Sequence, residues 1–340
     1  MPPLLSRKFR RRLAIWISLS VVFAFLALNA MAYMQARAMT HFVDSETRTL
    51  PPEQLSFLGR IGVLLTGVQI PRPVNLATPA DIGVAYQTFR FGGPHADDCE
   101  AWFIPAAGGS RRFCIQFHGY TSCKSSLLSS AKAFHDLGYD LLLVDFQGSG
   151  GSHGDQTTLG YREADDVAAA VAFARQQWSP ANLILYGQSM GGAAILRAVA
   201  EQNVQPSAVI IESVFDRLLS AVDDRFHAMG MPAFPLANLL VFWGGQQQGY
   251  NAFKLNPADY AKKVHCPVLM FQGGVDPRVT TAQAQNLFNN LAGPKQFELF
   301  EKSGHCAFQS DDPVRWTAAI SGFLAKSPPL TQPPTAPAWK

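Results

Sequence analysis

Short apolar runs alternate with longer helical segments from about residue 82 to residue 326, and this alternation restricts the fold more than any other feature of the chain. Runs of this kind are typical of strands that are buried on both faces. The order strand, helix, strand predicts an α/β fold with a mostly parallel sheet that helices cover on both faces. The expected strands span residues 113–117, 141–145, 182–186, 208–212, 268–272 and 296–300, and the expected helices span residues 125–137, 162–177, 190–202, 281–291 and 313–325.

Two segments depart from this rhythm. Residues 86–91 and 100–104 are expected to form an antiparallel pair at one edge of the sheet. Residues 214–263 have a helical pattern and lie between two strands, where a small helical cap over a site would be inserted. Apolar residues of this cap either line an acyl pocket or attach the cap to the core, and they are Phe215, Leu218, Leu219, Phe226, Met229, Phe234, Leu236, Leu239, Leu240 and Phe242.

An uncharged stretch runs from residue 13 to residue 36, directly after a basic segment at residues 1–12. Its apolar part is long enough, at about 1.5 Å per residue, to cross a hydrocarbon core of roughly 30 Å. We therefore predict a single transmembrane anchor over residues 13–34. The arginines before it predict a cytoplasmic N-terminus and a domain, residues 82–326, on the exported side. The alternative is a signal peptide cleaved after Ala32, in Ala30-Met31-Ala32, which would leave a secreted domain.

The segments on either side of the domain have less regular patterns. Residues 35–81 form a juxtamembrane segment in which Pro51-Pro52-Glu53 predicts the start of an amphipathic helix. Because the polar face of this helix holds little beyond Arg60, we expect it to pack on the domain rather than on a membrane surface. Residues 327–340 hold five prolines and predict an extended tail.

Charge and cysteine content argue against two classes of function. The formal net charge is +3, and five basic residues precede the apolar stretch, so the domain has no excess of basic residues for binding nucleic acid. The five cysteines are scattered and form no CxxC pair, which argues against a structural zinc site. The sequence implies no metal and no organic cofactor.

The sequence Gly187-Gln188-Ser189-Met190-Gly191 fits the motif G-x-S-x-G. An expected strand ends at Tyr186 and an alanine-rich helix is expected from Met190, so Ser189 occupies a tight turn between them. Such a turn needs small neighbours because the helix must approach the strand closely. Ser189 is therefore the predicted nucleophile, and the alternative is a serine in an ordinary glycine-flanked turn.

A serine hydroxyl needs a base that takes its proton and a third group that orients the base. His305 is the predicted base, because it alone among eight histidines follows the last expected strand. Asp276 is the predicted acid, because it lies in a glycine-rich turn after a strand, at the edge where active sites of parallel sheets lie. Glu212 ends the preceding strand and is the alternative acid.

Acyl transfer also requires backbone N–H groups that donate to the developing oxyanion. Met190 follows the nucleophile and is the first predicted donor. The loop after residues 113–117 is expected to supply the second, through the amide of Tyr120 or, as the alternative, of Thr121.

Residues 82–326 resemble the α/β-hydrolase superfamily and, within it, the serine aminopeptidase S33 and monoacylglycerol-lipase-like branch. The chain departs from that branch at Gln147, where arginine is frequent, and at Ser122, where the oxyanion loop often has a second glycine. The resemblance implies the α/β-hydrolase fold and the triad of Ser189, Asp276 and His305. The matching motifs are His118-Gly119, Asp145-Phe-Gln-Gly-Ser-Gly-Gly-Ser152, Gly187-Gln-Ser-Met-Gly-Gly192, Cys266-Pro-Val-Leu-Met-Phe-Gln-Gly-Gly-Val-Asp276 and Ser303-Gly-His305.

These features predict a membrane-anchored serine hydrolase that forms an acyl-enzyme and needs no cofactor. The expected substrate is a carboxylic ester of a small molecule or a lipid, with an amide or thioester as further options. The alternatives are a serine aminopeptidase or an acyltransferase on the same fold, or a non-catalytic membrane-tethered binding module. An aminopeptidase would need an acid in the cap to hold the substrate's amino terminus, and Asp216, Asp223 and Asp224 are available for that role.

Overall fold

An eight-stranded sheet forms the centre of the computed structural model, which describes residues 7–45, 47–50, 54–93, 96–108 and 111–326. The strand order is β1-β2-β4-β3-β5-β6-β7-β8. β2 pairs antiparallel with β1 and β4, whereas all other neighbours are parallel. The strands are Gln87–Gly93 (β1), Ala96–Ile104 (β2), Arg112–Phe117 (β3), Asp140–Val144 (β4), Asn182–Gln188 (β5), Ala208–Glu212 (β6), Val268–Gly273 (β7) and Lys295–Phe300 (β8).

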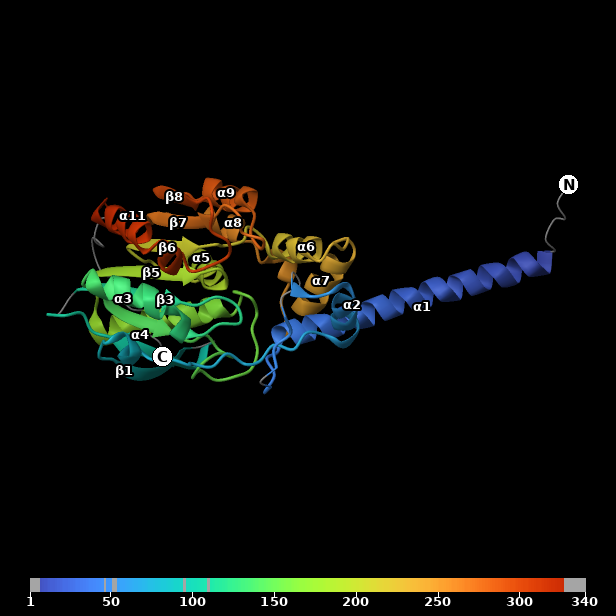
Figure 1. The fold of residues 1–340 in the computed structure, drawn as a ribbon, viewed down its shortest axis with the longest axis horizontal. Coiled ribbons are helices and arrows are strands. Elements are labelled where there is room, and N and C mark those ends of the chain that lie inside the picture. Colours follow the sequence, from blue (N-terminus) through green and yellow to red (C-terminus); the bar gives the residue numbers. More distant parts are fainter. Residues whose placement is uncertain (1–6, 46, 51–53, 94–95, 109–110, 327–340) are drawn as a thin grey trace.

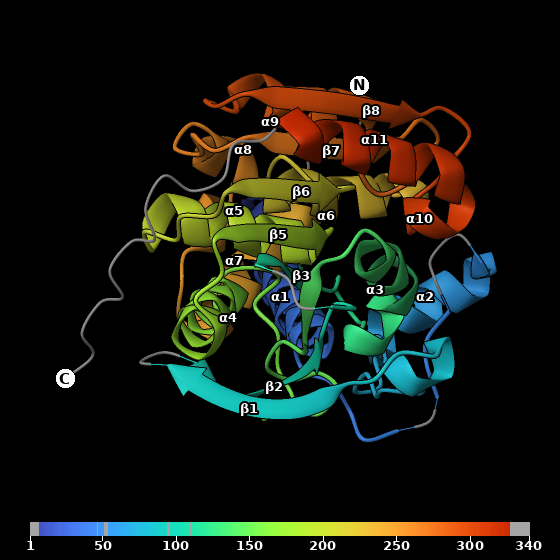
Figure 2. The ribbon, with the colours of Figure 1, turned by 90° about the vertical axis from the view of Figure 1, so that its left-hand side faces the viewer.

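Helices cover both faces of the sheet (Figure 2). Side chains alternate along each strand, so Phe113 and Ile115 of β3 pack in one apolar cluster and Cys114 packs in the other. This is the mostly parallel, two-sided sheet that the sequence predicts. One layer contains α4 (Glu163–Trp178), α5 (Met190–Glu201), α8 (Pro257–Ala261) and α9 (Thr281–Asn290), and the other contains η2 (Pro79–Ile82), η3 (Lys124–Leu127), α3 (Leu128–Asp136), α10 (Phe308–Asp311) and α11 (Pro313–Lys326).

A helical cap is inserted between β6 and α8. It consists of α6 (Leu218–Ala228), α7 (Leu236–Gln248) and η4 (Ala252–Lys254). The cap lies at one end of the sheet, beside the helix that contains the N-terminal apolar stretch (Figure 1).

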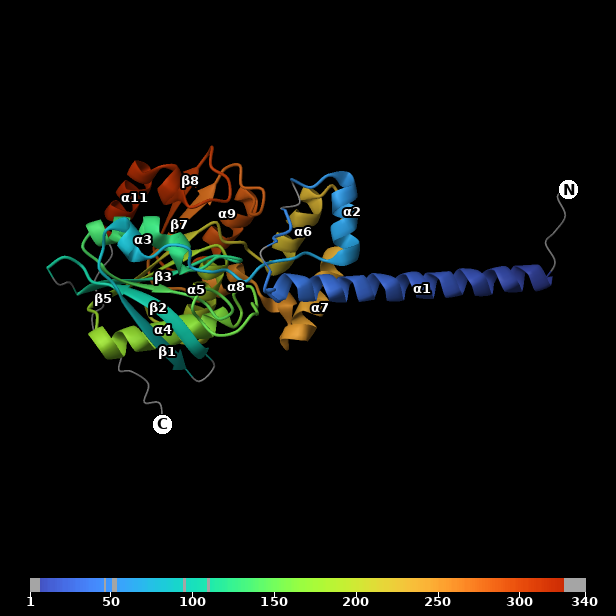
Figure 3. The same cartoon turned by 60° about the horizontal axis from the view of Figure 1, so that its bottom comes forward.

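That helix, α1 (Arg7–Thr40), is a single unit of 34 residues that extends away from the rest of the protein (Figures 1 and 3). Its apolar part has a mean hydropathy of 2.2, and residues 7–27 are exposed along their whole length. The helix therefore has the length and composition of one membrane span. Its buried residues, Ala32, Ala36 and Thr40, recur at every fourth position, so one face of its last turns packs on the cap.

The last turns of α1 are joined to α7 by hydrogen bonds as well as by packing. Nε1 of Trp243 donates to Oδ1 of Asn29 over 3.2 Å, and Nε2 of Gln247 donates to the carbonyl oxygen of Tyr33 over 2.8 Å. The predicted anchor ends at residue 34, whereas the helix continues to Thr40 because α7 covers its final turns.

The amphipathic helix of the juxtamembrane segment is α2 (Phe57–Thr66), whose first turn is capped by Ser56. It lies beside α1 and α6 (Figure 3), where Nε2 of Gln35 donates to the carbonyl of Val63 and Nη1 of Arg60 donates to the carbonyl of Met229. The predicted start at residues 51–53 and the proline-rich tail at residues 327–340 lie outside the described residues.

Candidate active site

Ser189 lies on the sharp turn between β5 and α5. Its φ of 50° and ψ of −112° fall in a region that residues other than glycine rarely occupy. The N–H of Ser189 donates to the carbonyl oxygen of Glu212 over 2.7 Å, which ties the turn to β6. A strained strand-to-helix turn of this kind is what the G-x-S-x-G motif predicts.

Two glycines allow α5 to approach the sheet closely. A Cβ on Gly187 would lie 2.7 Å from the backbone of Gly191, and a Cβ on Gly191 would lie 2.6 Å from the carbonyl oxygen of Phe117. Both distances are far below an ordinary contact, so neither position accepts a larger side chain without a shift of the backbone.

His305 and Asp276 come together from the loops that follow β8 and β7. Nδ1 of His305 donates to Oδ2 of Asp276 over 2.8 Å. The side chain of Asp276 is fully buried, and that of His305 is 15% exposed. Because Nδ1 is engaged, Nε2 is the ring nitrogen that can accept a proton, and His305 lines the same cavity as Ser189.

The environment of Asp276 favours its ionised form. Burial alone would raise the pKa of Asp276, but the hydrogen bond and charge of His305, together with two backbone donors, outweigh burial and hold the pKa below its ordinary value. The two donors are the N–H groups of Arg278 and Val279, which lie 2.8 and 3.0 Å from Oδ1. A carboxylate held in this way can stabilise a protonated histidine.

Glu212, the alternative acid, ends β6 and lines the same cavity. Its carboxyl group accepts hydrogen bonds from Nε1 of Trp316 over 2.5 Å and from Nε2 of Gln188 over 3.4 Å. Burial raises the pKa of Glu212 to about 7, although these hydrogen bonds oppose the rise. The structure therefore pairs His305 with Asp276, while Glu212 is engaged by Trp316.

His118 holds the loop after β3 in place, a role that the sequence analysis did not assign. Its Nδ1 donates to the carbonyl oxygen of Gly119 over 2.8 Å, and its Nε2 accepts from the N–H of Phe146 over 3.1 Å. Burial lowers the pKa of His118, so the ring stays neutral with one donor and one acceptor. The signal in the sequence was the pair His118-Gly119 directly after a strand.

The loop that His118 holds passes directly beside the turn of Ser189. A Cβ on Gly119 would lie 3.6 Å from Cβ of Ser189. Tyr120 and Met190, the predicted oxyanion donors, line the cavity together with Ser189. The positive φ of the loop, 56°, falls on Thr121 and not on Ser122, so serine is accommodated where related loops often have glycine.

We call the space around Ser189 and His305 the inner cavity. Its volume is about 300 Å³, within the size range of small-molecule sites. Three α1 residues, Ala36, Met39 and Thr40, form part of its wall, which the sequence analysis did not foresee. The cap contributes apolar side chains from Phe215, Leu218, Ala221, Val222, Leu240 and Val241.

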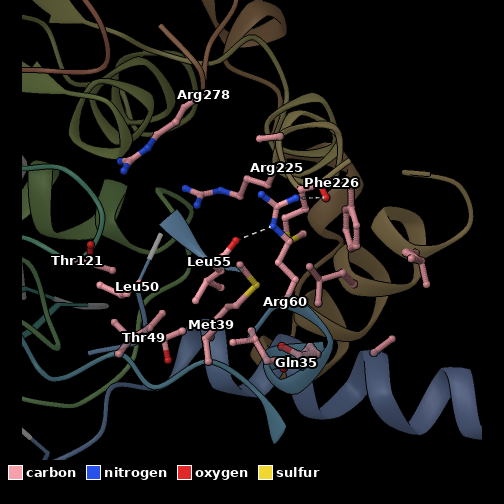
Figure 4. Close-up of a pocket in the computed structure, with 18 of the residues that line it drawn as sticks. Gln35, Met39, Thr49, Leu50, Leu55, Arg60, Thr121, Arg225, Phe226 and Arg278 are labelled. Atoms are coloured by element: carbon pink, nitrogen blue, oxygen red, sulfur yellow. Dashed lines mark hydrogen bonds between the residues drawn. The ribbon is translucent and has the colours of Figure 1, made fainter. Parts of the chain in front are cut away.

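A second space, the outer cavity, has a volume of about 200 Å³ and lies between α1, α2 and the cap (Figure 4). Leu28, Met31 and Ala32 of α1 form part of its wall. Of the cap residues expected to form an acyl pocket, some line this cavity and others line neither cavity. Phe226, Met229, Leu236 and Leu240 line the outer cavity, whereas Phe234 and Phe242 are exposed.

Residues 125–328 match the prolyl oligopeptidase family over more than half of the chain. The chain belongs to the prolyl oligopeptidase family. The uncharacterized protein Rv2307c of Mycobacterium tuberculosis is 29% identical over 239 residues, which cover 68% of this chain and 76% of that protein. Lysophosphatidylserine lipase ABHD12 of Macaca fascicularis is 21% identical over 302 residues, which cover 79% of this chain and 71% of that protein.

The esterase Pf2001 of Pyrococcus furiosus has the same fold. The two structures align with a TM-score of 0.64 and 20% identity, over 76% of this chain and 97% of the esterase. With the family match, this likeness identifies the chain as an α/β hydrolase.

The part of the chain that matches the prolyl oligopeptidase family contains Ser189, Asp276 and His305. It begins at Ser125, after the loop of Gly119 and Tyr120. The helices α1 and α2 therefore precede the matched segment, although α1 contributes to the wall of the inner cavity.

Proposed function

We propose that this chain is a membrane-anchored serine hydrolase that cleaves carboxylic esters, with Ser189 as nucleophile, His305 as base and Asp276 as the orienting acid. One observation carries the proposal: the 2.8 Å hydrogen bond between His305 and Asp276 lies at a cavity that also contains Ser189 on its strained turn. The three residues come from the carboxyl ends of β5, β7 and β8, where active sites of open parallel sheets lie.

In the proposed reaction, Oγ of Ser189 attacks the ester carbonyl carbon while Nε2 of His305 takes the hydroxyl proton. The bond to the alcohol oxygen then breaks, and the alcohol leaves with that proton. A water molecule, deprotonated by His305, hydrolyses the acyl-enzyme and releases the carboxylic acid. The N–H groups of Tyr120 and Met190 stabilise the oxyanion in both steps.

The charges around the site favour an ester over the amino terminus of a peptide. Oδ2 of Asp216 accepts from Nδ2 of Asn286 over 2.8 Å, and Oδ2 of Asp224 accepts from Nε2 of Gln283 over 2.7 Å, so α9 engages both acids. Within the described residues, neither acid lines the inner or the outer cavity, whereas Arg225 lines both. The names lipase and esterase of two similar proteins support the same choice.

The finer placement within the superfamily, in the monoacylglycerol-lipase-like and serine aminopeptidase S33 branch, stays a prediction that rests on the sequence motifs. For location, we propose that α1 is an uncleaved anchor with the N-terminus in the cytoplasm and the remaining domain on the exported side. The exposed apolar surface of residues 13–27 and the basic residues before it support this orientation.

A fluorophosphonate probe tests the nucleophile, because such probes need an activated serine and a formed oxyanion site. We expect the full chain to be labelled and the variant Ser189→Ala to remain unlabelled. Equal labelling of the two would end the assignment, and an unlabelled wild-type chain that hydrolyses no ester would favour the non-catalytic binding module.

The bond class is tested with chromogenic substrates. We expect faster cleavage of p-nitrophenyl esters with medium acyl chains than of p-nitrophenyl acetate or aminoacyl p-nitroanilides, because apolar cap side chains line the inner cavity. A marked preference for the anilide would favour the aminopeptidase.

A further inference from the structure

The fully exposed part of α1 is shorter than the hydrocarbon core of a bilayer. Residues 13–27 are uncharged and exposed, and at about 1.5 Å per residue they extend for roughly 22 Å. Because a hydrocarbon core is roughly 30 Å thick, an upright helix that enters it at Leu13 leaves it at about Ala32. A span that began earlier would place Arg12 in the core, which is costly. Residues 28–32, which the rest of the protein partly covers, therefore belong to the span.

Two helices lie against α1 at this level. Nε1 of Trp243 in α7 donates to Oδ1 of Asn29, and the ring of Trp243 packs edge-on against that of Tyr33 at a centroid distance of 5.5 Å. The other helix, α2, lies beside α1 (Figure 3) and shares the wall of the outer cavity with Leu28 and Met31. Both α7 and α2 are therefore at the depth of the last turns of the span.

The turn between α6 and α7, residues 229–235, lies beside α2. Nη1 of Arg60 in α2 donates to the carbonyl oxygen of Met229, and Met229 and Leu236 line the outer cavity together with Leu28 of α1. Figure 1 shows the cap on the side of the domain from which the exposed part of α1 extends. The cap, α1 and α2 thus meet where α1 leaves the rest of the protein.

One side of α2 packs on its neighbours, as the sequence analysis predicted for this helix. Arg60 contacts Met229 after α6, and the carbonyl oxygen of Val63 accepts from Gln35 of α1. Phe57, Leu58 and Ile61 fall on another side of α2, because successive residues of a helix are rotated by about 100°. Packing on the domain therefore leaves this apolar side uncovered.

Five large apolar side chains on α2, on the turn and on α7 are exposed. Phe57 and Leu58 are 75% and 78% exposed, and Phe234 in the turn is 78% exposed. Ile61 of α2 and Phe242 of α7 are exposed to 40% and 43%. We call these five side chains the apolar collar. Exposed apolar side chains that gather on neighbouring elements mark a surface that contacts a partner or a membrane.

The part of the cap that carries the collar has no charged side chain. No Asp, Glu, Lys, Arg or His occurs in residues 228–253, which include the turn and all of α7. The one charged residue of α2 is Arg60, and its guanidinium donates to the carbonyl oxygens of Leu55 and Met229. Since the transfer of a charge from water into lipid is costly, a surface without exposed charges is suited to contact with a bilayer.

We propose that the apolar collar is immersed in the bilayer that α1 spans, in the leaflet on the side of the domain. This inference rests on the proposed anchor and does not depend on ester hydrolysis. The collar reaches below the lipid headgroups by about 5–10 Å, as the apolar faces of interfacial helices do. Residues 28–32 of α1 then lie in the hydrocarbon core and complete the span. Tyr33 and Trp243 lie near the boundary between lipid and water, where tyrosine and tryptophan are enriched in membrane proteins.

The test measures the depth of a fluorophore on single cysteines of the full chain in phosphatidylcholine vesicles, at a low ratio of protein to lipid. Cys266 and Cys306, the two cysteines that are not buried, are first replaced by serine. A nitrobenzoxadiazole label is then attached to one of four variants: Leu58→Cys or Phe234→Cys in the collar, Phe23→Cys in the span, or Val314→Cys as the control. All four positions are exposed, so the substitutions remove no buried contact.

Val314 is the matched control because its side chain is 79% exposed, about as much as those of Leu58 and Phe234. It lies in the first turn of α11, on the part of the domain far from α1 (Figure 1).

Quenching is compared between vesicles whose lipid carries a nitroxide at acyl carbon 5, near the headgroup, and vesicles with the nitroxide at carbon 12, near the bilayer centre. We expect the labels at Leu58 and Phe234 to lose about half or more of their emission to the shallow nitroxide and less to the deep one. The label at Phe23 should show the reverse order, because it lies in the middle of the span. The label at Val314 should be quenched by neither lipid.

Three results would overturn the collar while the label at Phe23 still reports a spanning helix. A label at Leu58 or Phe234 that is quenched no more than the one at Val314 would place the collar in water. Emission that is shifted to the blue but not quenched by lipid would mean that another copy of the chain covers the collar. Equal quenching at Val314 would show that the domain adsorbs to lipid without a preferred surface.

A failure of the proposed anchor gives a different pattern. If neither nitroxide quenches the label at Phe23, α1 does not span the bilayer, and the collar falls with the anchor. Ester hydrolysis and labelling of Ser189 by the fluorophosphonate are measured separately and do not depend on that result.

Discussion

The phenol of Tyr120 donates a hydrogen bond of 2.5 Å to the carbonyl oxygen of Met39, in the last turn of α1. Burial raises the pKa of Tyr120 to about 12, so the phenol keeps its proton and remains a donor. Because Gly119 and Tyr120 pass beside Ser189, this bond fixes the proposed oxyanion loop against the N-terminal helix.

We therefore expect Tyr120→Phe to lower kcat for a p-nitrophenyl ester by about fivefold, since it removes one buried hydrogen bond but keeps the backbone N–H. Tyr86→Phe is the matched control, because Tyr86 packs on Trp102 in the apolar cluster on the other face of the sheet. Steady-state kinetics give kcat of both variants on the same p-nitrophenyl ester. Equal rates for the two variants would show that the link to Met39 does not position the loop.

Asp276→Asn is expected to lower kcat by about 10⁴-fold, as in the general serine triad, whereas Glu212→Gln should have a much smaller effect. Asparagine removes the negative charge and no longer selects the form of His305 with its proton on Nδ1. The rates are measured on the same ester at one pH. The opposite ranking would make Glu212 the acid.

The stability of the protein should depend on pH through Glu212. Its pKa is about 7 in the folded chain and near 4.5 when unfolded, so the folded state binds more protons between these values and loses stability as the pH rises from about 4.5 to 7. This loss amounts to roughly 3 kcal/mol. Glu212→Gln cannot ionise and still accepts a hydrogen bond from Trp316.

Urea unfolding followed by tryptophan fluorescence should therefore show the free energy of unfolding of Glu212→Gln rising relative to wild type between pH 5 and pH 8. A difference that stays constant across this range would mean that Glu212 is not the group that titrates.

The full chain should remain in the membrane pellet after a high-salt wash, because residues 13–27 of α1 are apolar and exposed. Fractionation and the N-terminal sequence of the mature protein test this together. A soluble form that begins at Tyr33 would establish the signal peptide. That form would also lack the hydrogen bond that Trp243 donates to Asn29 and three wall residues of the outer cavity, Leu28, Met31 and Ala32.

Local pattern was sufficient to predict the central sheet. The run at residues 208–212 is β6 residue for residue, and the run at residues 268–272 is β7 without its last glycine. These strands are buried on both faces, and their residues are apolar except at the carboxyl end, where Glu212 ends β6 and Gln272 precedes the last residue of β7. The turn around Ser189 could also be predicted from local sequence, because the close approach of α5 to the sheet requires glycine beside Ser189.

Contacts between distant segments could not be predicted in this way. Nothing in residues 35–40 indicates that α7 covers them, because Ala36 meets Gly244 only after the cap has folded. That Arg225 of the cap and Arg278 after β7 line the same cavities depends likewise on the path of the cap. Trp316, which lies near the end of the chain, donates a hydrogen bond to Glu212. The sequence could not show this contact, so it left Asp276 and Glu212 as alternative acids, whereas the structure pairs His305 with Asp276.

The continuity of α1 determines how far the enzyme can reach. A domain on a flexible tether samples a wide volume around its anchor, but here a single rigid helix runs from the apolar stretch into the wall of the inner cavity. With α1 in a bilayer, as we propose, the outer cavity is held at a fixed height and tilt above one leaflet. Turnover of a lipid ester would then depend on the mole fraction of substrate in that leaflet and on lateral diffusion, rather than on its concentration in solution.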